Sequence, residues 1–139
     1  MNRSLLIVED DLDQLEILAR SFIRAGYRVI SVHHPRQALE AASFQQFQVA
    51  LLDDSLPEMD ANELMQRLKR TQDAVQVVIL SGCEDPDRRA KVGGAFACLG
   101  KPCTMALLEA TVEDAFERAV DPSPLCEQPA LTNRISVAT

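Results

Sequence analysis

Five short apolar runs, separated by segments with helical spacing, constrain the fold of this chain most. The runs are Leu5–Val8, Val29–Val32, Val49–Leu52, Val75–Leu80 and Ala95–Leu99. Most of them are continuously apolar rather than alternating, which is typical of strands buried on both faces of a parallel sheet. A parallel sheet needs crossover connections that cover its two faces, so the intervening segments are expected to be helices.

The segments between the runs carry start and stop signals of helices. Apolar residues recur at three- and four-residue steps after the first run, and Gly26 stands where a left-handed C-cap residue belongs. A second helix is expected over Pro35–Ser43, a third capped by Asn62, a short fourth over Pro86–Val92, and a fifth capped by Thr104. This alternation predicts right-handed crossovers and a three-layer, doubly wound α/β domain.

Size and composition favour one globular domain. The chain has 139 residues, of which 47% are hydrophobic and 25% are charged. No apolar run approaches the ~18–20 residues of a membrane-spanning helix. Met1–Ser4 leads directly into a short apolar run that ends in acids, unlike a signal peptide. We therefore expect a cytoplasmic protein with no membrane partner.

Charge and cysteine spacing exclude two further classes of function. The chain has 14 basic and 21 acidic side chains, a net charge of −7, so we expect no nucleic-acid contact by this domain itself. None of the four cysteines forms a Cys-x-x-Cys pair, and neither His33 nor His34 is spaced to complete a zinc site. Reduced cysteines that pack as small hydrophobic side chains are expected.

The alternating pattern stops near Asp121. Residues 1–120 are therefore predicted to form the domain. Residues 121–139 contain Pro122, Pro124 and Pro129 and no clear periodicity, so they are predicted to be a flexible tail or the stub of a linker.

Acidic and polar residues follow the ends of the predicted strands. Glu9 and Asp10 follow the first run, Asp53 follows the third, Ser81 the fourth and Lys101 the fifth. In an open parallel sheet, ligands bind outside the carboxyl ends of the strands, where the strand order reverses. If the first and third runs are neighbours there, their carboxylates crowd together and repel.

A divalent cation relieves that repulsion, and Mg²⁺ suits such a site because it binds carboxylate and carbonyl oxygens and coordinates phosphate oxygens. A hydroxyl from Ser81 and an ammonium from Lys101 add a hydrogen-bond donor and a positive charge. The set predicts a site at which an aspartate accepts a phosphoryl group.

Four motifs in this order resemble the receiver domain of two-component response regulators. They are Leu-Leu-Ile-Val-Glu-Asp-Asp, Val-Ala-Leu-Leu-Asp-Asp-Ser-Leu-Pro-Glu-Met-Asp, Val-Val-Ile-Leu-Ser-Gly and Gly-Lys-Pro, and the match covers about residues 4–119. The resemblance implies a flavodoxin-like, chemotaxis-regulator-like fold with five parallel strands in the order 2-1-3-4-5.

The resemblance also implies a role for each site residue. Asp53 corresponds to the phosphoacceptor, Asp10 to a direct magnesium ligand, and Glu9 to a ligand acting through water. Ser55 corresponds to the residue whose backbone carbonyl binds the metal, for which Mn²⁺ is a second candidate. Ser81 and Lys101 correspond to the phosphoryl-binding hydroxyl and amine, and a cis Lys101–Pro102 peptide bond is implied. Asp54 is interpreted as a loop acid, and Asp11 as a cap of the first helix.

Three positions depart from the family pattern. Ala61 stands where glycine is common in a turn, which predicts a changed or strained turn. Gly82 replaces a small alanine. Cys98 occupies the fifth-strand position of a switch tyrosine or phenylalanine, so the output coupling is expected to run by another route, with Phe96 as one candidate on the same face.

The leading functional prediction is a signalling switch rather than an enzyme, one that catalyses only its own Mg²⁺-dependent phosphorylation and dephosphorylation. Its implied partners are a sensor histidine kinase or phosphotransfer protein and a downstream protein on the face of the fourth helix, fifth strand and fifth helix. The resemblance also suggests homodimerisation on phosphorylation.

Three alternatives are weighed against it. One is a degenerate receiver that acts as an unphosphorylated binding module, and another is the N-terminal part of a longer DNA-binding regulator. The third, a hydrolase of the haloacid-dehalogenase type, is disfavoured because its Asp-x-Asp pair should follow the first strand, whereas Asp53-Asp54-Ser55 follows the third.

Overall fold

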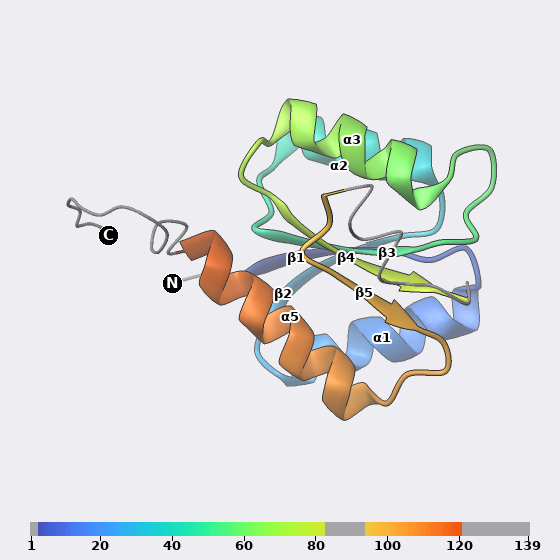
Figure 1. Cartoon of the computed structure of the whole chain (residues 1–139), viewed down its shortest axis with the longest axis vertical. Helices are drawn as coiled ribbons and strands as arrows, with labels where there is room; N and C mark the ends of the chain where they lie inside the picture. The colour runs from blue at the N-terminus through green and yellow to red at the C-terminus, as the bar shows by residue number, and fades with distance from the viewer. Residues whose placement is uncertain (1–2, 83–93, 121–139) are drawn as a thin grey trace.

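A five-stranded parallel sheet in the order β2-β1-β3-β4-β5 forms the centre of the computed structural model, which describes residues 3–82 and 94–120 (Figure 1). The strands are β1 (Ser4–Val8), β2 (Arg28–Val32), β3 (Val49–Asp53), β4 (Gln76–Ser81) and β5 (Ala97–Gly100). The helices are α1 (Leu12–Arg24), α2 (Pro35–Phe44), α3 (Ala61–Thr71) and α5 (Met105–Val120). The predicted three-layer α/β fold and its strand order are confirmed.

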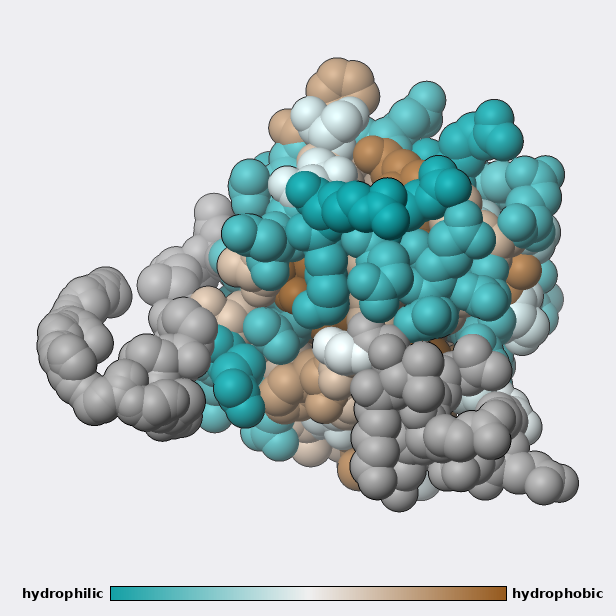
Figure 2. All heavy atoms as spheres, turned by 45° about the horizontal axis from the view of Figure 1, so that its top comes forward, coloured by the Kyte–Doolittle hydropathy of each residue, from teal (hydrophilic) through white to brown (hydrophobic). Residues whose placement is uncertain are grey.

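The helices lie in two layers, with α2 and α3 on one face of the sheet and α1 and α5 on the other (Figure 1). Successive residues of β1 point to opposite faces, so Leu6 and Val8 join the α2–α3 cluster while Leu5 and Ile7 join the α1–α5 cluster. Every residue of β3 is buried, which explains why its sequence reads as a continuous apolar run. The outward side of the α2–α3 layer is largely hydrophilic (Figure 2), as expected of helices that bury one stripe.

Most helix boundaries agree with the sequence signals. Asp11 caps α1 by accepting hydrogen bonds from the backbone N–H groups of Asp13 and Gln14, and Thr104 Oγ1 accepts one from the N–H of Leu107 in α5. Gly26 has a φ of 101°, the left-handed conformation predicted for it.

The predicted cap of α3 is wrong by two residues. Asp60, rather than Asn62, is the N-cap, and its carboxylate accepts a hydrogen bond from the N–H of Glu63. The helix therefore begins at Ala61, two residues earlier than a cap at Asn62 allows.

The predicted helix over 86–92 and the predicted tail over 121–139 lie outside the described residues. Within the described part of the chain, no helix is long and apolar enough to cross a membrane.

Candidate functional site

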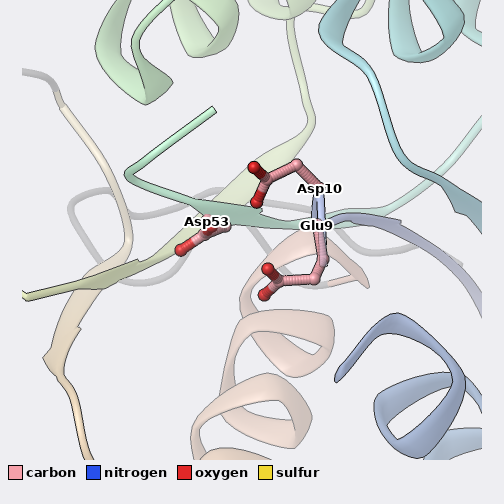
Figure 3. Close-up of side chains that lie close together, drawn as sticks. All are labelled: Glu9, Asp10 and Asp53. Atoms are coloured by element: carbon pink, nitrogen blue, oxygen red, sulfur yellow. The ribbon is translucent and has the colours of Figure 1, made fainter. Parts of the chain in front are cut away.

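The strand register brings the predicted acids together at the carboxyl edge of the sheet. Val8 of β1 pairs with Leu52 of β3, so the residues that follow them, Glu9 and Asp53, lie side by side. One carboxylate oxygen from each of Glu9, Asp10 and Asp53 lies within 4.8 Å of the others. Figure 3 shows the carboxylates of Glu9 and Asp10 turned to the side on which Asp53 lies.

The three carboxylates differ in their access to water. Glu9 is 4% exposed and Asp53 is 2% exposed, whereas Asp10 is exposed. Burial, followed by the charge of Asp53, raises the pKa of Glu9 to about 7 from its ordinary value of 4.5. The cluster therefore holds negative charge at a free-energy cost that a bound cation would remove.

The amine of Lys101 already lies against the predicted phosphoacceptor. Lys101 Nζ donates a hydrogen bond to Asp53 Oδ1 at 2.5 Å, and the Lys101–Pro102 peptide bond is cis, as the resemblance implied. Burial lowers the pKa of Lys101, but the hydrogen bond to Asp53 and its charge outweigh burial, so this pKa is raised. The lysine is thus held in its charged form beside Asp53.

The donor set fits a hard divalent cation. Every ligand atom that the cluster offers is a carboxylate oxygen, which suits Mg²⁺ or Mn²⁺ better than zinc. Ser55 Oγ donates a hydrogen bond to Asp53 Oδ2 at 3.5 Å, so the residue predicted to offer a backbone carbonyl also lies next to Asp53. The resemblance assigns direct contact with such an ion to Asp10, Asp53 and the backbone carbonyl of Ser55, and a contact through water to Glu9.

Ser81 lies at the same edge but is engaged elsewhere. Its side chain is fully buried, and its Oγ donates a hydrogen bond to Asp54 Oδ2 at 3.0 Å. Asp54 is therefore more than the loop acid that the sequence suggested. The sequence reasoning missed this contact, although the β3–β4 register, which pairs Asp53 with Leu80, places the following residues beside each other.

Two expectations about departures from the family pattern are corrected. Among the described residues, the non-glycine residue with positive φ is Glu58, at 68°, so the unusual backbone lies three residues before Ala61, which is helical and fully buried. Phe96 precedes β5 and packs against the α1–α5 cluster, whereas Cys98 packs against the α2–α3 cluster. Phe96 therefore does not share the packing face of Cys98.

A Cβ added at Gly82 would meet no atom of the described residues within 4 Å. Alanine at this position would therefore fit against the described part of the chain.

A pocket of ≈ 500 Å³ opens beside the carboxylates, and the sequence reasoning did not predict it. Its polar end contains Glu9 and Lys101. Its apolar wall comes from α1 and α5 and includes Ile17, Leu18, Met105 and Leu108. The sequence signal that could have found it is Ile17, an apolar residue directly before Leu18 of the helix's apolar stripe, which the structure leaves 54% exposed on α1.

Comparison with known proteins identifies the family. Residues 5–113 match the model of the response regulator receiver domain. The transcriptional activator protein PfeR of Pseudomonas aeruginosa is 35% identical over 127 residues, which cover 89% of this chain and 41% of that protein. Sporulation initiation phosphotransferase F of Bacillus subtilis is 29% identical over 104 residues, covering 73% of this chain and 84% of that protein. The chain thus spans less than half the length of the PfeR activator.

The fold comparison agrees. A response regulator receiver domain protein from Methanospirillum hungatei superimposes with a TM-score of 0.81 at 21% identity, covering 88% of this chain and all of that one. The chain belongs to the response regulator receiver domain family. Acceptance of a phosphoryl group and binding of Mg²⁺ at an acidic site are general to this family, and its members act with histidine kinases and downstream effectors.

Proposed function

We propose that this domain takes a phosphoryl group from the phosphohistidine of a sensor kinase or phosphotransfer protein onto Asp53. The observation that carries the proposal is the environment of Asp53, a buried carboxylate with Lys101 Nζ at 2.5 Å and two further acids within reach of one cation. Because the acceptor is the protein's own side chain, the domain acts as a switch and not as an enzyme on a free substrate.

The proposed transfer is a nucleophilic displacement at phosphorus. A carboxylate oxygen of Asp53 forms a bond to phosphorus while the phosphorus–nitrogen bond of the donor breaks, and its electron pair leaves with the imidazole nitrogen. Lys101 pairs with the charge on the transferred group, and a bound Mg²⁺ supplies neutralisation of its oxygens. Because Asp53 is buried, little water reaches it, which limits hydrolysis of the phosphoryl group during and after the transfer.

The surroundings of the site support two partner contacts. The pocket between α1 and α5 ends at Glu9 and Lys101, so an apolar surface of the phosphodonor can dock there while its histidine reaches Asp53. The β5–α5 side carries the described part of the face proposed for output. In relatives such as the PfeR activator, which are longer than this chain, we propose that the corresponding output is control of transcription.

Phosphorylation of the purified domain tests the proposal directly. With Mg²⁺ and a small acyl phosphate, the wild type should gain one phosphoryl group by intact mass, and Asp53→Asn should gain none. Asp60→Asn is the matched control, because it changes an acid in the same loop while asparagine still caps α3. A wild type that stays unmodified with acyl phosphate and with kinases would favour the unphosphorylated binding module instead.

Lys101→Ala separates metal binding from phosphoryl stabilisation. We expect it to bind Mg²⁺ as the wild type does but to be phosphorylated more slowly by about a hundredfold, the usual effect of losing one charged transition-state partner. Lys69→Ala is the control, because Lys69 Nζ contacts the carbonyl of Val75 at the opposite edge of the sheet. Unchanged phosphorylation in Lys101→Ala would contradict the role assigned to this amine.

A further inference from the structure

The two groups expected to contact the phosphoryl group on Asp53, the amine of Lys101 and the hydroxyl of Ser81, have different partners in the unphosphorylated domain. Lys101 Nζ already contacts Asp53, whereas the Ser81 hydroxyl donates to the neighbouring carboxylate of Asp54 at 3.0 Å. The backbone holds this arrangement from both sides, since Asp54 N donates to the carbonyl of Leu80 and Lys101 N donates to the carbonyl of Ser81, each at 2.8 Å. Ser81 is therefore a fixed, fully buried residue whose hydroxyl is directed to Asp54.

A serine hydroxyl has one proton to donate. In the unphosphorylated domain, Asp54 Oδ2 accepts the hydrogen bond that this proton makes. An oxygen of a phosphoryl group on Asp53 would need to accept the same hydrogen bond. A hydrogen bond to a carboxylate is stronger than one to a neutral acceptor, so the competition has a measurable cost.

We infer that Asp54 is a positioning residue that holds the Ser81 hydroxyl away from Asp53, so that phosphorylation must displace it. The inference rests on the proposed function of Asp53. It assigns to Asp54 control over how strongly the phosphorylated state is favoured.

Affinity for beryllofluoride, a stable mimic of the phosphoryl group, measures this competition at equilibrium. With saturating Mg²⁺, we expect Asp54→Ala to bind beryllofluoride more tightly than the wild type by on the order of tenfold, the factor one charged hydrogen bond supplies. Asp54→Asn should show a smaller gain, because its amide oxygen still accepts from Ser81 without a charge. Asp73→Asn, which removes one acid at the opposite edge of the sheet, should bind as the wild type does.

A double-substitution cycle separates the hydrogen bond from simple charge repulsion. In the Ser81→Ala background no hydroxyl remains for Asp54 to hold, so Asp54→Ala should change the affinity by less than about twofold. An equal gain in both backgrounds would mean that Asp54 acts only through its charge, and no gain in either would exclude any influence; both results overturn the inference.

The proposed function fails in a different way. A wild type that neither binds beryllofluoride nor accepts a phosphoryl group from acyl phosphate overturns the role of Asp53, and the inference with it. Thermal unfolding of each variant, followed by circular dichroism, verifies that the affinities refer to folded protein.

Discussion

Polar side chains are buried both at the amino edge of the sheet, where the parallel strands begin, and at the carboxyl edge, where they end. The two edges differ in whether those side chains find hydrogen-bond partners within the fold. The buried polar or charged residues of the described chain are Glu9, Asp53, Ser81 and Gln72. Gln72 lies alone at the amino edge, and the other three lie at the carboxyl edge. Gln72 has a neutral amide whose oxygen and nitrogen both make hydrogen bonds, whereas Glu9 and Asp53 are two carboxylates that lie beside each other.

The hydrogen bonds of Gln72 explain why it is buried. Its Oε1 accepts from the N–H of Phe47 at 2.9 Å, and its Nε2 donates to the carbonyls of Ala42 at 3.0 Å and Gln45 at 2.7 Å. One side chain thereby satisfies three backbone groups, one in the last turn of α2 and two in the connection from α2 to β3. Among the described residues at the carboxyl edge, the ammonium of Lys101 faces crowded carboxylates, and a bound cation would balance their remaining charge. Buried polarity that is satisfied internally stabilises the fold, whereas buried polarity left in conflict prepares a binding site.

Gln72→Leu should produce the largest change in stability and no change in phosphorylation. Leucine fills a similar volume but leaves three backbone groups without their partner, so we expect unfolding free energy to fall by about 3 kcal/mol. Chemical denaturation measures this loss, and Gln46→Leu, at an exposed position nearby, is the control. A loss equal to that of the control would mean that the amide network contributes little.

Mg²⁺ should stabilise the wild type through the carboxyl edge alone. At a free concentration about a hundred times the dissociation constant, binding to the folded state adds about 2.7 kcal/mol. Asp10→Asn should lose most of this gain, while Asp11→Asn should keep it, because Asp11 caps α1 and is not part of the carboxylate cluster. Thermal unfolding with and without Mg²⁺ tests the pair, and equal responses of the two variants would place the ion elsewhere.

Glu9→Gln should increase stability in the absence of metal. The folded-state pKa of Glu9, about 7, lies above its ordinary 4.5, so ionising this carboxyl opposes folding. Wild-type stability is therefore undiminished by Glu9 below about pH 4.5 and declines as the pH rises toward about 7. Above about pH 8 without Mg²⁺, the variant should be more stable by on the order of 2 kcal/mol, and its decline with pH should be shallower. Parallel pH profiles of the two proteins would contradict this origin of the instability.

The parts of the molecule that follow from backbone periodicity could be predicted from the sequence. The continuous apolar run of β3 indicated a doubly buried central strand, and acids after β1 and β3 indicated converging carboxylates. Both inferences depend only on the alternation of side chains and on parallel strands ending at one edge.

The parts that depend on competition between near-equal neighbours could not be predicted. Asp60 and Asn62 are both good caps, and the path of the loop, with its positive φ at Glu58, decides in favour of Asp60. Ser81 likewise has two carboxylates within its neighbourhood, and only the actual side-chain geometry selects Asp54. In both cases the alternatives differ in free energy by about one hydrogen bond or less. A pattern of residue types does not reveal a difference that small.

The position of Asp53 at the end of β3 has a consequence for how the domain fails under stress. β3 lies in the middle of the sheet and is buried along its whole length, so its amides should exchange with deuterium only on global opening. Surface helix ends open at much lower cost. Mild heating should therefore open the helix ends at the surface while Asp53, the proposed phosphoacceptor, is still held in place.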